Sequence, residues 1–494
     1  MNKIKIQVGN VSCKVIDADP MLTRNLADVL SVMADNYWFS PKYKNGYWDG
    51  KISFMDRRSN TFPTGLLDKV LDYFEEYNLP YDLEDVREDV STFKLDKIDY
   101  NYTAVDRVAR DYQVDSVNAV LENKFEGLFF PRGIINLATN AGKTFVASIL
   151  LKEIYPKLIE HDKIFLFVTH SKEIANQARE SISNVLGEDV GMLGTGEWDV
   201  KPVTVALIPT LYRRREKKDF IELTDKIIGY IADECHHAKS DSFYKVFNMF
   251  NNAIYRIGLT GTAKQKSSVN QTKLICSTGK VLIRISNDYL INQGFSAKPK
   301  CVFLKQEKLN FGTLDYQEAY NKCIVNNVDR AKLTSTICKR ETSEGNRVLI
   351  LVEYIEHALT ILDNLNIGDD KVVEFTHGNL SDKERARIIE DLAKGKIDIL
   401  VSTSILDEGV DVSGINAIIY ARGMKSTRKL LQGLGRGLRV KKDGSNVRYY
   451  DFIDDSNPKL LKHSRERYKI LKDEKFSLKV MDENEYMNTD LENI

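Results

Sequence analysis

The chain has 494 residues, with 71 Lys and Arg against 71 Asp and Glu, so its formal net charge is zero. This balance excludes a histone-like polycation and a disordered acidic chain, although a local basic face can still bind nucleic acid. A hydrophobic fraction of 43% and a charged fraction of 29% are ordinary for a soluble globular protein. The length predicts about three to four domains.

No apolar run reaches the roughly 20 residues that cross a bilayer, and residues 1–9 lack the apolar core of a signal peptide. The six cysteines are scattered without a CxxC pair, which argues against a structural zinc site and fits a reducing compartment. We therefore expect a cytoplasmic protein without a membrane partner.

The first part of the chain predicts a small α/β domain at residues 1–95. Alternation of apolar and polar residues indicates strands, and apolar residues repeating on one face indicate helices. The expected elements are strands at 3–8 and 11–16, helices at 22–36 and 65–77, and a polar linker at 83–102.

Two series of short apolar runs follow, and each predicts a parallel sheet covered by helices. The expected strands are 133–137, 164–169, 204–208, 227–233 and 254–260 in the first sheet, and 347–352, 372–376, 397–403, 417–420 and 447–452 in the second. The predicted fold class is therefore α/β, with two tandem parallel-sheet domains at 96–290 and 291–455. A charged helical extension is expected at 456–494.

A phosphate-binding loop follows the strand at 133–137. Residues 138–144 read Ala-Thr-Asn-Ala-Gly-Lys-Thr and precede an apolar helix, so backbone N–H groups and the helix N-terminus can face a phosphate. Leu137 stands where the full pattern has its first glycine, and Asn140 takes a second glycine position. The expected ligand contacts are a cradle made by Thr139, Asn140, Ala141 and Gly142, terminal phosphates bound by Lys143, and Mg²⁺ bound by Thr144.

An acid pair, Asp233 and Glu234, ends the buried strand at 227–233. At this position Asp233 can hold the Mg²⁺ shell, and Glu234 can polarise the attacking water. Solvated acid pairs are common on surfaces, but a pair that ends an apolar strand downstream of a phosphate loop is uncommon. Together these residues predict an ATP hydrolase that uses ATP and Mg²⁺.

These residues resemble the DExH-type helicases and translocases of superfamily 2, which implies that the two sheet domains are RecA-like. Segment 110–113 resembles the Q-motif, so Gln113 is expected to read the adenine edge while Tyr112 stacks on the ring. Segments 168–177, 259–263, 376–378 and 402–411 resemble further motifs of the family. The resemblance implies nucleic-acid contacts by Ser171, Gln177, Thr260, His377 and Thr403, and nucleotide contacts by Gly409 and Asp411.

Segment 432–439, Gln-Gly-Leu-Gly-Arg-Gly-Leu-Arg, fits the family motif QxxGRxxR. Charge on a transferred phosphoryl group needs a cation from another element, and an arginine supplied in this way raises the rate about 10³–10⁵-fold. We therefore expect Gln432, Arg436 and Arg439 to complete the catalytic site when the two sheet domains close on ATP.

Residues 37–58 interleave aromatic and basic side chains. Aromatic rings can stack on exposed bases while lysines neutralise phosphates, so we expect Lys42, Lys44 and Lys51 to contact DNA. For Trp38 and Trp48, packing in the core of their own domain is the favoured interpretation.

This stretch, FxPKYKNGYWDGKI, is similar to the N-terminal domain of the UvsW-type helicases of tailed bacteriophages. The resemblance then covers nearly the whole chain and implies an ATP-dependent DNA helicase of 3′→5′ polarity. It implies unwinding and branch migration of Holliday junctions, stalled forks, R-loops and D-loops during recombination, replication and repair. The implied partners are branched, single-stranded and duplex DNA, with a single-strand-binding protein as a further candidate, and we expect a monomer in the host cytoplasm.

Two alternatives stay open, because their motifs are alike: an RNA helicase, and a duplex-DNA translocase that does not separate strands. A non-motor nucleotide switch is disfavoured by Glu234, Arg436 and Arg439, since a switch needs no complete hydrolytic set. The basic segment 212–218 is interpreted equally as a DNA contact or as a solvated loop.

Overall fold

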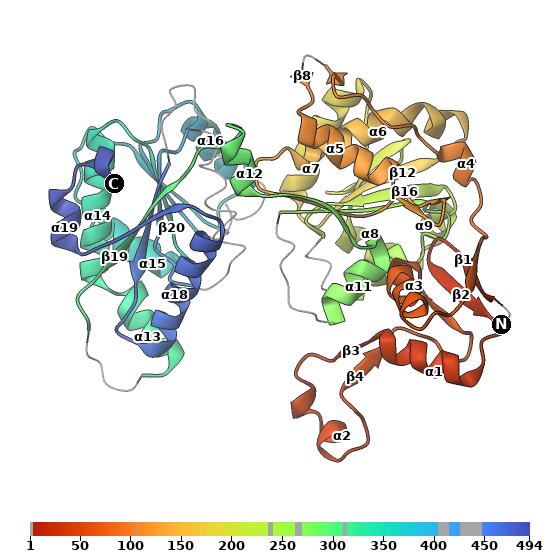
Figure 1. The fold of residues 1–494 in the computed structure, drawn as a ribbon. Coiled ribbons are helices and arrows are strands. Elements are labelled where there is room, and N and C mark those ends of the chain that lie inside the picture. The colour runs from red at the N-terminus through yellow and green to blue at the C-terminus, as the bar shows by residue number, and fades with distance from the viewer. Residues whose placement is uncertain are drawn as a thin grey trace. The chain divides into compact units, whose positions relative to one another are not determined.

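The computed structural model describes residues 3–105, 107–235, 241–261, 269–309, 314–403, 414–424 and 447–494. The chain forms two compact units, which are drawn in Figure 1. The first unit consists of residues 1–138 and 142–285, and the second consists of residues 286–494 together with 139–141. No helix in the described part of the chain is long and apolar enough to cross a membrane.

The first unit begins with a four-stranded sheet of order β5-β2-β1-β6. Its elements are β1 (Ile4–Val8), β2 (Ser12–Ile16), α1 (Pro20–Val29), β5 (Thr61–Pro63), η2 (Thr64–Leu66), α3 (Leu67–Glu76) and β6 (Tyr81–Asp85). Apolar side chains of α1 and α3 pack on the sheet to form one core. β6 pairs in parallel with β1, so the expected linker at 83–102 begins as a strand and continues into α4 (Val90–Phe93).

Helix α1 is shorter than the expected helix at 22–36. After Val29 the chain continues as β3 (Ser31–Met33), which pairs with the antiparallel strand β4 (Lys51–Ser53). The hydroxyls of Ser31 and Ser53 both donate to the carbonyl oxygen of Ala27, at 2.5 and 2.9 Å. These two hydroxyls satisfy a carbonyl group in the last turn of the helix. The residues that would form a further helical turn belong to β3 instead.

The second part of the first unit is an eight-stranded sheet of order β14-β13-β15-β12-β16-β17-β11-β18, parallel except for β14. Its strands are β11 (Arg132–Leu137), β12 (Ile164–Thr169), β13 (Gly191–Gly194), β14 (Glu197–Asp199), β15 (Val203–Leu207), β16 (Ile227–Ala232), β17 (Tyr255–Thr260) and β18 (Val281–Ile285). The strands expected here from the sequence are present within one residue at each end, whereas β13, β14 and β18 were not predicted.

Helices cover both faces of this sheet, as a parallel sheet requires. Figure 1 shows α5, α6 and α7 on one face and α8 and α11 on the other. The helices are α5 (Asp111–Leu121), α6 (Lys143–Glu160), α7 (Lys172–Leu186), α8 (Ile208–Arg214), α9 (Lys218–Thr224), α10 (Asp241–Phe247) and α11 (Val269–Thr278). Short strand pairs are β7 (Thr103–Ala104) with β8 (Arg107–Val108), and β9 (Lys124–Phe125) with β10 (Leu128–Phe129).

The second unit is built on a fully parallel seven-stranded sheet of order β21-β22-β20-β23-β24-β19-β25. Its strands are β19 (Lys300–Lys305), β20 (Val348–Leu351), β21 (Val373–Thr376), β22 (Ile399–Ser402), β23 (Ala417–Tyr420), β24 (Arg448–Ile453) and β25 (Ser477–Met481). Its helices are α12 (Asn287–Asn292), α13 (Tyr316–Tyr320), α14 (Val328–Ser343), α15 (Ile355–Asp363), α16 (Asp382–Ala393), α18 (Pro458–Asp473) and α19 (Glu483–Asn488). The predicted α/β class with parallel sheets is confirmed.

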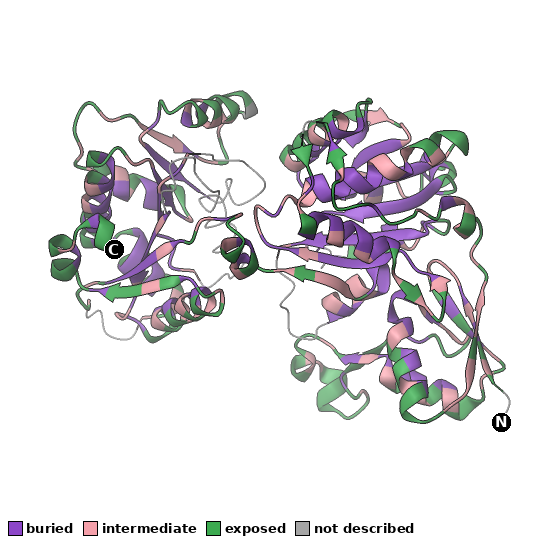
Figure 2. Ribbon diagram, turned by 45° about the horizontal axis from the view of Figure 1, so that its top comes forward, coloured by how far each residue is buried: buried purple, intermediate pink, exposed green. Residues whose placement is uncertain are grey.

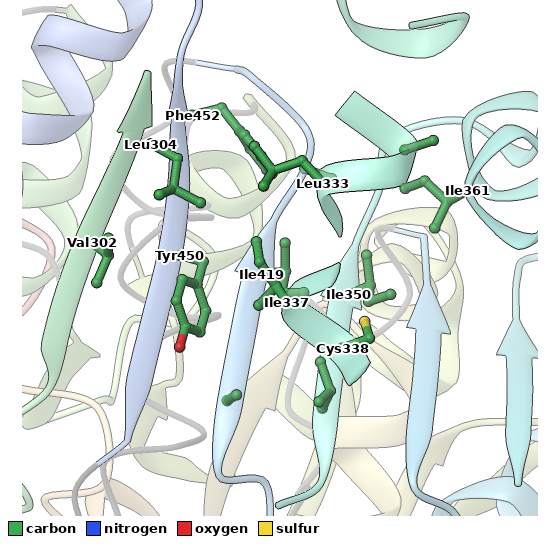
Figure 3. Close-up of a cluster of buried hydrophobic side chains, with 14 of the residues drawn as sticks. Val302, Leu304, Leu333, Ile337, Cys338, Ile350, Ile361, Ile419, Tyr450 and Phe452 are labelled. Carbon is green, nitrogen blue, oxygen red and sulfur yellow. The ribbon is translucent and has the colours of Figure 1, made fainter. Parts of the chain in front are cut away.

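Each face of the second sheet has its own apolar core. Figure 3 shows the core in which α14 side chains, such as Ile337, lie against Ile350, Ile419 and Phe452 of the strands. The segment expected as a charged helical extension contains α18, but it then adds β25 as an edge strand beside β19. Figure 2 shows the strands of each unit buried beneath helices whose outer faces are exposed.

Arg132 ties the N-terminal sheet to the larger sheet of the same unit. Its guanidinium is 3% exposed and donates to the carbonyl oxygens of Cys276, Ser277 and Thr278 at 3.1–3.2 Å, at the end of α11. It also donates to the carbonyl oxygen of Asn10, in the β1–β2 turn, at 3.1 Å.

A second contact lies beside it, at Gly65 in η2. A Cβ atom on Gly65 would lie 1.8 Å from the carbonyl oxygen of Ile275 in α11, so only glycine fits there. Lys280 and Asp68 add an ion pair at 3.3 Å between the same two parts. The N-terminal sheet and the larger sheet are therefore packed as one body.

We expect Arg132→Met to loosen this junction, because it leaves three buried carbonyl oxygens and the partly buried one of Asn10 without this donor, at a local cost of about 2–4 kcal/mol. Hydrogen exchange on the full chain should show faster amide exchange in α11 and in the β1–β2 turn. Arg57→Met is the matched control, since Arg57 is exposed. Unchanged exchange in the Arg132 variant would contradict the role of this residue.

Candidate nucleotide site and nucleic-acid interface

The phosphate loop turns sharply between β11 and α6. Asn140 and Gly142 have left-handed backbones, with φ of 69° and 81°, and Gly142 is the N-cap of α6. A Cβ atom on Gly142 would lie 2.6 Å from Nε2 of Gln113 in α5, so the loop needs glycine both for its φ and for this close approach. The N-terminus of an 18-residue helix is thereby presented at the end of β11.

The acid pair meets the loop at the carboxyl end of the sheet. β17 lies between β11 and β16, and all three strands are parallel. The ammonium group of Lys143 lies 3.2 Å from a carboxylate oxygen of Glu234, with side-chain exposures of 15% and 13%. Glu234 has a left-handed φ of 45°, and its N–H donates to Oδ1 of Asp233 at 2.9 Å. Lys143 and Glu234, 91 residues apart in sequence, thus form one small polar site.

The electrostatics of this site follow from its burial. Burial alone would lower the pKa of Lys143, but the carboxylates of Glu234 and Asp233 outweigh it and raise that pKa above its ordinary value. Burial raises the pKa of Asp233, Glu234 raises it further, and Lys143 opposes both effects. Burial and the neighbouring carboxylate thus disfavour the charged form of Asp233, and a nearby cation favours it.

The oxygen donors at this site fit Mg²⁺, which prefers hard oxygen ligands and usually keeps waters and substrate phosphates in its shell. Thr144 offers a hydroxyl at the start of α6, and Asp233 a carboxylate at the end of β16. In the described ranges, no group of three or more His, Cys, Asp or Glu side chains could hold a metal by itself. The donor set is therefore of the kind that shares a metal with phosphate.

The Q-motif residues lie beside the loop but are buried. Gln113 is 0% exposed, and its Oε1 accepts from the backbone N–H of Arg110 at 3.1 Å. Tyr112 is 1% exposed, and its hydroxyl accepts from the Arg110 guanidinium at 3.2 Å. The expected stacking by Tyr112 does not fit this burial, because neither ring face is open to a base. Arg107, which was not singled out from the sequence, lies close to Tyr112, and its guanidinium carbon is 4.4 Å from the centroid of the Phe145 ring in α6.

The nucleic-acid residues expected in the first unit divide into buried and exposed ones. Ser171 is the N-cap of α7, where its hydroxyl donates to Glu173 at 2.7 Å and accepts from the N–H of Ile174 at 3.5 Å. Thr260 is 2% exposed at the end of β17, whereas Gln177 is exposed on α7. Of these three, only Gln177 presents its side chain at the surface.

The two expected contacts in the second unit lie at the ends of adjacent strands. His377 follows β21, and its Nδ1 accepts from the N–H of Asn379 at 3.3 Å. Thr403 follows β22, is 6% exposed, and donates its N–H to the carbonyl oxygen of Thr376 at 3.2 Å. The remaining expected site residues, Gly409, Asp411, Gln432, Arg436 and Arg439, lie outside the described residues.

A cavity of about 410 Å³, which was not predicted from the sequence, opens beside the start of α7. The β13–β14 hairpin and α8 form its other walls. Lys172 and Arg213 line it and form no ion pair with a described residue, while Arg214 lies 3.9 Å over the Trp198 ring and pairs with Asp219. Residues 212–214 of the basic segment 212–218 thus belong to α8, and the Arg213 guanidinium lines the cavity while its Nε donates to the carbonyl oxygen of Pro209 at 3.2 Å.

The aromatic and basic segment between β3 and β4 is exposed. Lys42, Lys44 and Lys51 all lie at the surface, as expected. The core-packing interpretation is wrong for Trp38, which is 50% exposed. Trp48 is half-buried, and its ring N–H donates to the carbonyl oxygen of Lys51 at 2.7 Å.

Three family models match the chain. "DNA helicase UvsW, N-terminal" matches residues 3–83, "Type III restriction enzyme, res subunit" matches residues 107–265, and "Helicase conserved C-terminal domain" matches residues 329–441. These ranges fall in turn on the N-terminal sheet, the sheet that carries the phosphate loop, and the sheet of the second unit.

Two relatives extend over most of the chain. It is 26% identical to the ATP-dependent DNA helicase UvsW of Enterobacteria phage T4, over 96% of this chain and 98% of the relative. It is 29% identical to the DNA 3′-5′ translocase XPB2 of Sulfurisphaera tokodaii, over 67% of this chain and 79% of the relative.

Solved structures share the fold at low identity. The DNA-bound Type ISP restriction-modification enzyme LlaBIII aligns with a TM-score of 0.54 and 14% identity, covering 84% of this chain and 36% of that one. Dbp5 of Saccharomyces cerevisiae, bound to RNA and ADP BeF3, aligns with a TM-score of 0.52 and 15% identity, covering 76% and 90%. Since one of these holds DNA and the other RNA, the fold alone does not distinguish the two substrates.

We expect Gly142→Ala to disrupt the loop and lower affinity for a fluorescent ATP analogue with Mg²⁺ at least tenfold, because the added methyl displaces Gln113. Gly127→Ala is the matched control: Gly127 has a φ of 83°, and nothing lies within 4 Å of its added Cβ. The control then carries only the left-handed penalty of about 1–2 kcal/mol. Equal nucleotide affinity in the two variants would rule out the contact between Gln113 and the loop as a determinant.

Proposed function

Because the chain is an ATP-dependent DNA helicase of the UvsW type, we propose that it couples ATP hydrolysis to the unwinding and branch migration of branched DNA. The proposed substrates are Holliday junctions, stalled forks, R-loops and D-loops, and the context is recombination, replication and repair in the host cytoplasm. The observation that carries the proposal is an exposed aromatic and lysine-bearing hairpin built on the same packed body as the phosphate loop.

In the proposed ATP cycle, Lys143 exchanges partners. It pairs with Glu234 at 3.2 Å, and an ATP phosphate competes for the same ammonium group. Phosphate binding by Lys143 would release the Glu234 carboxylate to orient the attacking water. Mg²⁺ bound through Thr144 and Asp233 would neutralise charge on the phosphates, while Arg436 and Arg439 are proposed to supply the cation for the transition state.

For the DNA track in the first unit we propose the cavity beside α7. Lys172 and Arg213 offer two unpaired cations there, and Gln177 is exposed on the same helix as Lys172. Side chains of this kind bind a phosphate backbone without regard to base sequence. In the second unit, His377 and Thr403 are proposed to contact DNA. A 3′→5′ polarity is supported by the similarity to a protein named a DNA 3′-5′ translocase.

We expect Glu234→Gln to bind the ATP analogue within about threefold of the wild-type affinity, because glutamine has the size and shape of glutamate. Its turnover should fall at least about 100-fold, because the amide cannot accept a proton as the carboxylate can. Lys143→Ala should lose both binding and turnover. Glu222→Gln, an exposed exchange in α9, is the control. Wild-type turnover in Glu234→Gln would remove this residue from the base role.

The proposed function is tested by ATP hydrolysis with single-stranded DNA, blunt duplex, a four-way junction or RNA as separate stimulants, scored beside strand separation. We expect DNA to stimulate hydrolysis and the junction to be dissociated. Stimulation by duplex without strand separation would favour a translocase instead, and stimulation by RNA alone would favour an RNA helicase.

A further inference from the structure

We propose that residues 34–50, which we call the aromatic arm, are a base-stacking element for unpaired nucleotides at a DNA branch point. The inference rests on the proposed DNA function and assigns the arm its ligand. The arm connects β3 to β4, contains α2 (Pro41–Lys44), and projects beyond α1 in Figure 1.

The rings of the arm face solvent instead of the domain core. Tyr47 is 84% exposed, Phe39 is 68% exposed and Trp38 is 50% exposed. None of the three belongs to the apolar core under the N-terminal sheet. Exposed rings gathered in one short segment mark a binding surface, because single exposed apolar residues are normal but clusters are not.

The arm is held in shape by its own contacts. Tyr37 packs edge-on against Trp38 and Tyr43, with ring centroids 5.2 and 4.7 Å apart. A Cβ atom on Gly50 would lie 2.8 Å from the Tyr37 ring, so this ring is seated on the backbone of the returning strand. The N–H of Ala34 donates to the carbonyl oxygen of Gly50 at 2.8 Å. The exposed Trp38 ring is therefore pre-oriented by Tyr37, which lowers the entropy cost of binding.

The charges in the middle of the arm favour nucleic acid over a protein surface. Residues 36–48 contain no acidic side chain, while Asp35 and Asp49 lie at the two ends of the arm, and the Asp49 carboxylate accepts from the N–H of Lys51 at 2.9 Å. Lys42 and Lys44 are exposed, and neither forms an ion pair with a described residue. Rings flanked by unpaired cations match single-stranded nucleic acid, in which bases stack on aromatics while phosphates meet lysines. Fully paired duplex hides its base faces, so the rings favour unpaired nucleotides.

The arm is also placed to work with the motor. β3 and η2 both contact α11, whose end is capped by Arg132 of β11. Bases held by the arm would thus be fixed to the body that carries Lys143 and Glu234. Movement of paired DNA toward that body would meet a fixed stacking surface at the point where strands part.

Tryptophan fluorescence tests the stacking directly, since Trp38 is one of only three tryptophans. We expect a 20-nucleotide oligo(dT) to quench the emission of the full chain, and Trp38→Phe to lose most of this quenching. The double variant Phe39→Ala with Tyr47→Ala should bind oligo(dT) and a forked DNA about tenfold more weakly, with a smaller loss for a blunt duplex. Tyr77→Ala, which changes an exposed ring of the same domain outside the arm, is the control.

Trp48 also lies in the arm, so the test includes Trp38→Phe combined with Trp48→Phe. Quenching that persists in this double tryptophan variant, or wild-type affinity of Phe39→Ala with Tyr47→Ala for oligo(dT), would overturn the proposal and leave the arm to a protein partner. This failure is distinct from failure of the proposed function. A wild-type chain that shows quenching through Trp38 but dissociates no junction would refute branch migration and leave the arm assignment standing.

Discussion

The parallel order of β11, β17 and β16 is the constraint on which the nucleotide site depends. Parallel strands place their carboxyl ends at one edge, so the loop after β11 and the acids after β16 must meet there. One strand, β17, lies between β11 and β16, and across it the ammonium group of Lys143 lies 3.2 Å from the carboxylate of Glu234. Because β17 lies between the two strands, a change in its pairing would move Glu234 away from the phosphate loop.

A second constraint is the burial of Arg132. A guanidinium that caps α11 and also holds the β1–β2 turn makes the N-terminal sheet part of the ATP-binding unit. Gly65 allows this contact only because it has no side chain. The aromatic arm and Lys143 therefore belong to one packed body.

The sequence predicted those elements that depend on neighbouring residues or on a strong apolar pattern. Strands such as β12 and β23, apolar on both faces, were found at their actual bounds, and the loop and acid pair were recognised from their neighbours. β13 is a short run with glycine at both ends, and β25 is a half-exposed edge strand, so neither has a clear apolar pattern.

Side-chain burial was the harder quantity to predict. The sequence beside a charged stretch does not indicate whether an aromatic ring is buried, as that of Tyr112 is, or exposed, as that of Trp38 is. In both cases the outcome depends on contacts that are not local. The Arg110 guanidinium donates a hydrogen bond to the hydroxyl of the buried Tyr112. The β3–β4 pairing replaces the last turns of the expected helix, and Trp38 lies in the exposed connection between these two strands.

The edge strand β25 has a consequence for synthesis. It pairs with β19, a strand about 175 residues earlier, and Met481, Tyr486 and Leu491 join the core beneath α14. Translation runs from the N-terminus, so the first unit can complete its sheet before β25 and the residues after it have left the ribosome. The second unit lacks these residues during that time. The nascent chain would then carry a folded nucleotide-binding unit followed by a sheet whose β19 edge is unpaired and whose core beneath α14 lacks Met481, Tyr486 and Leu491. Stalling late in translation, or loss of the last residues, would expose that strand edge to chaperones and proteases while leaving the first unit intact.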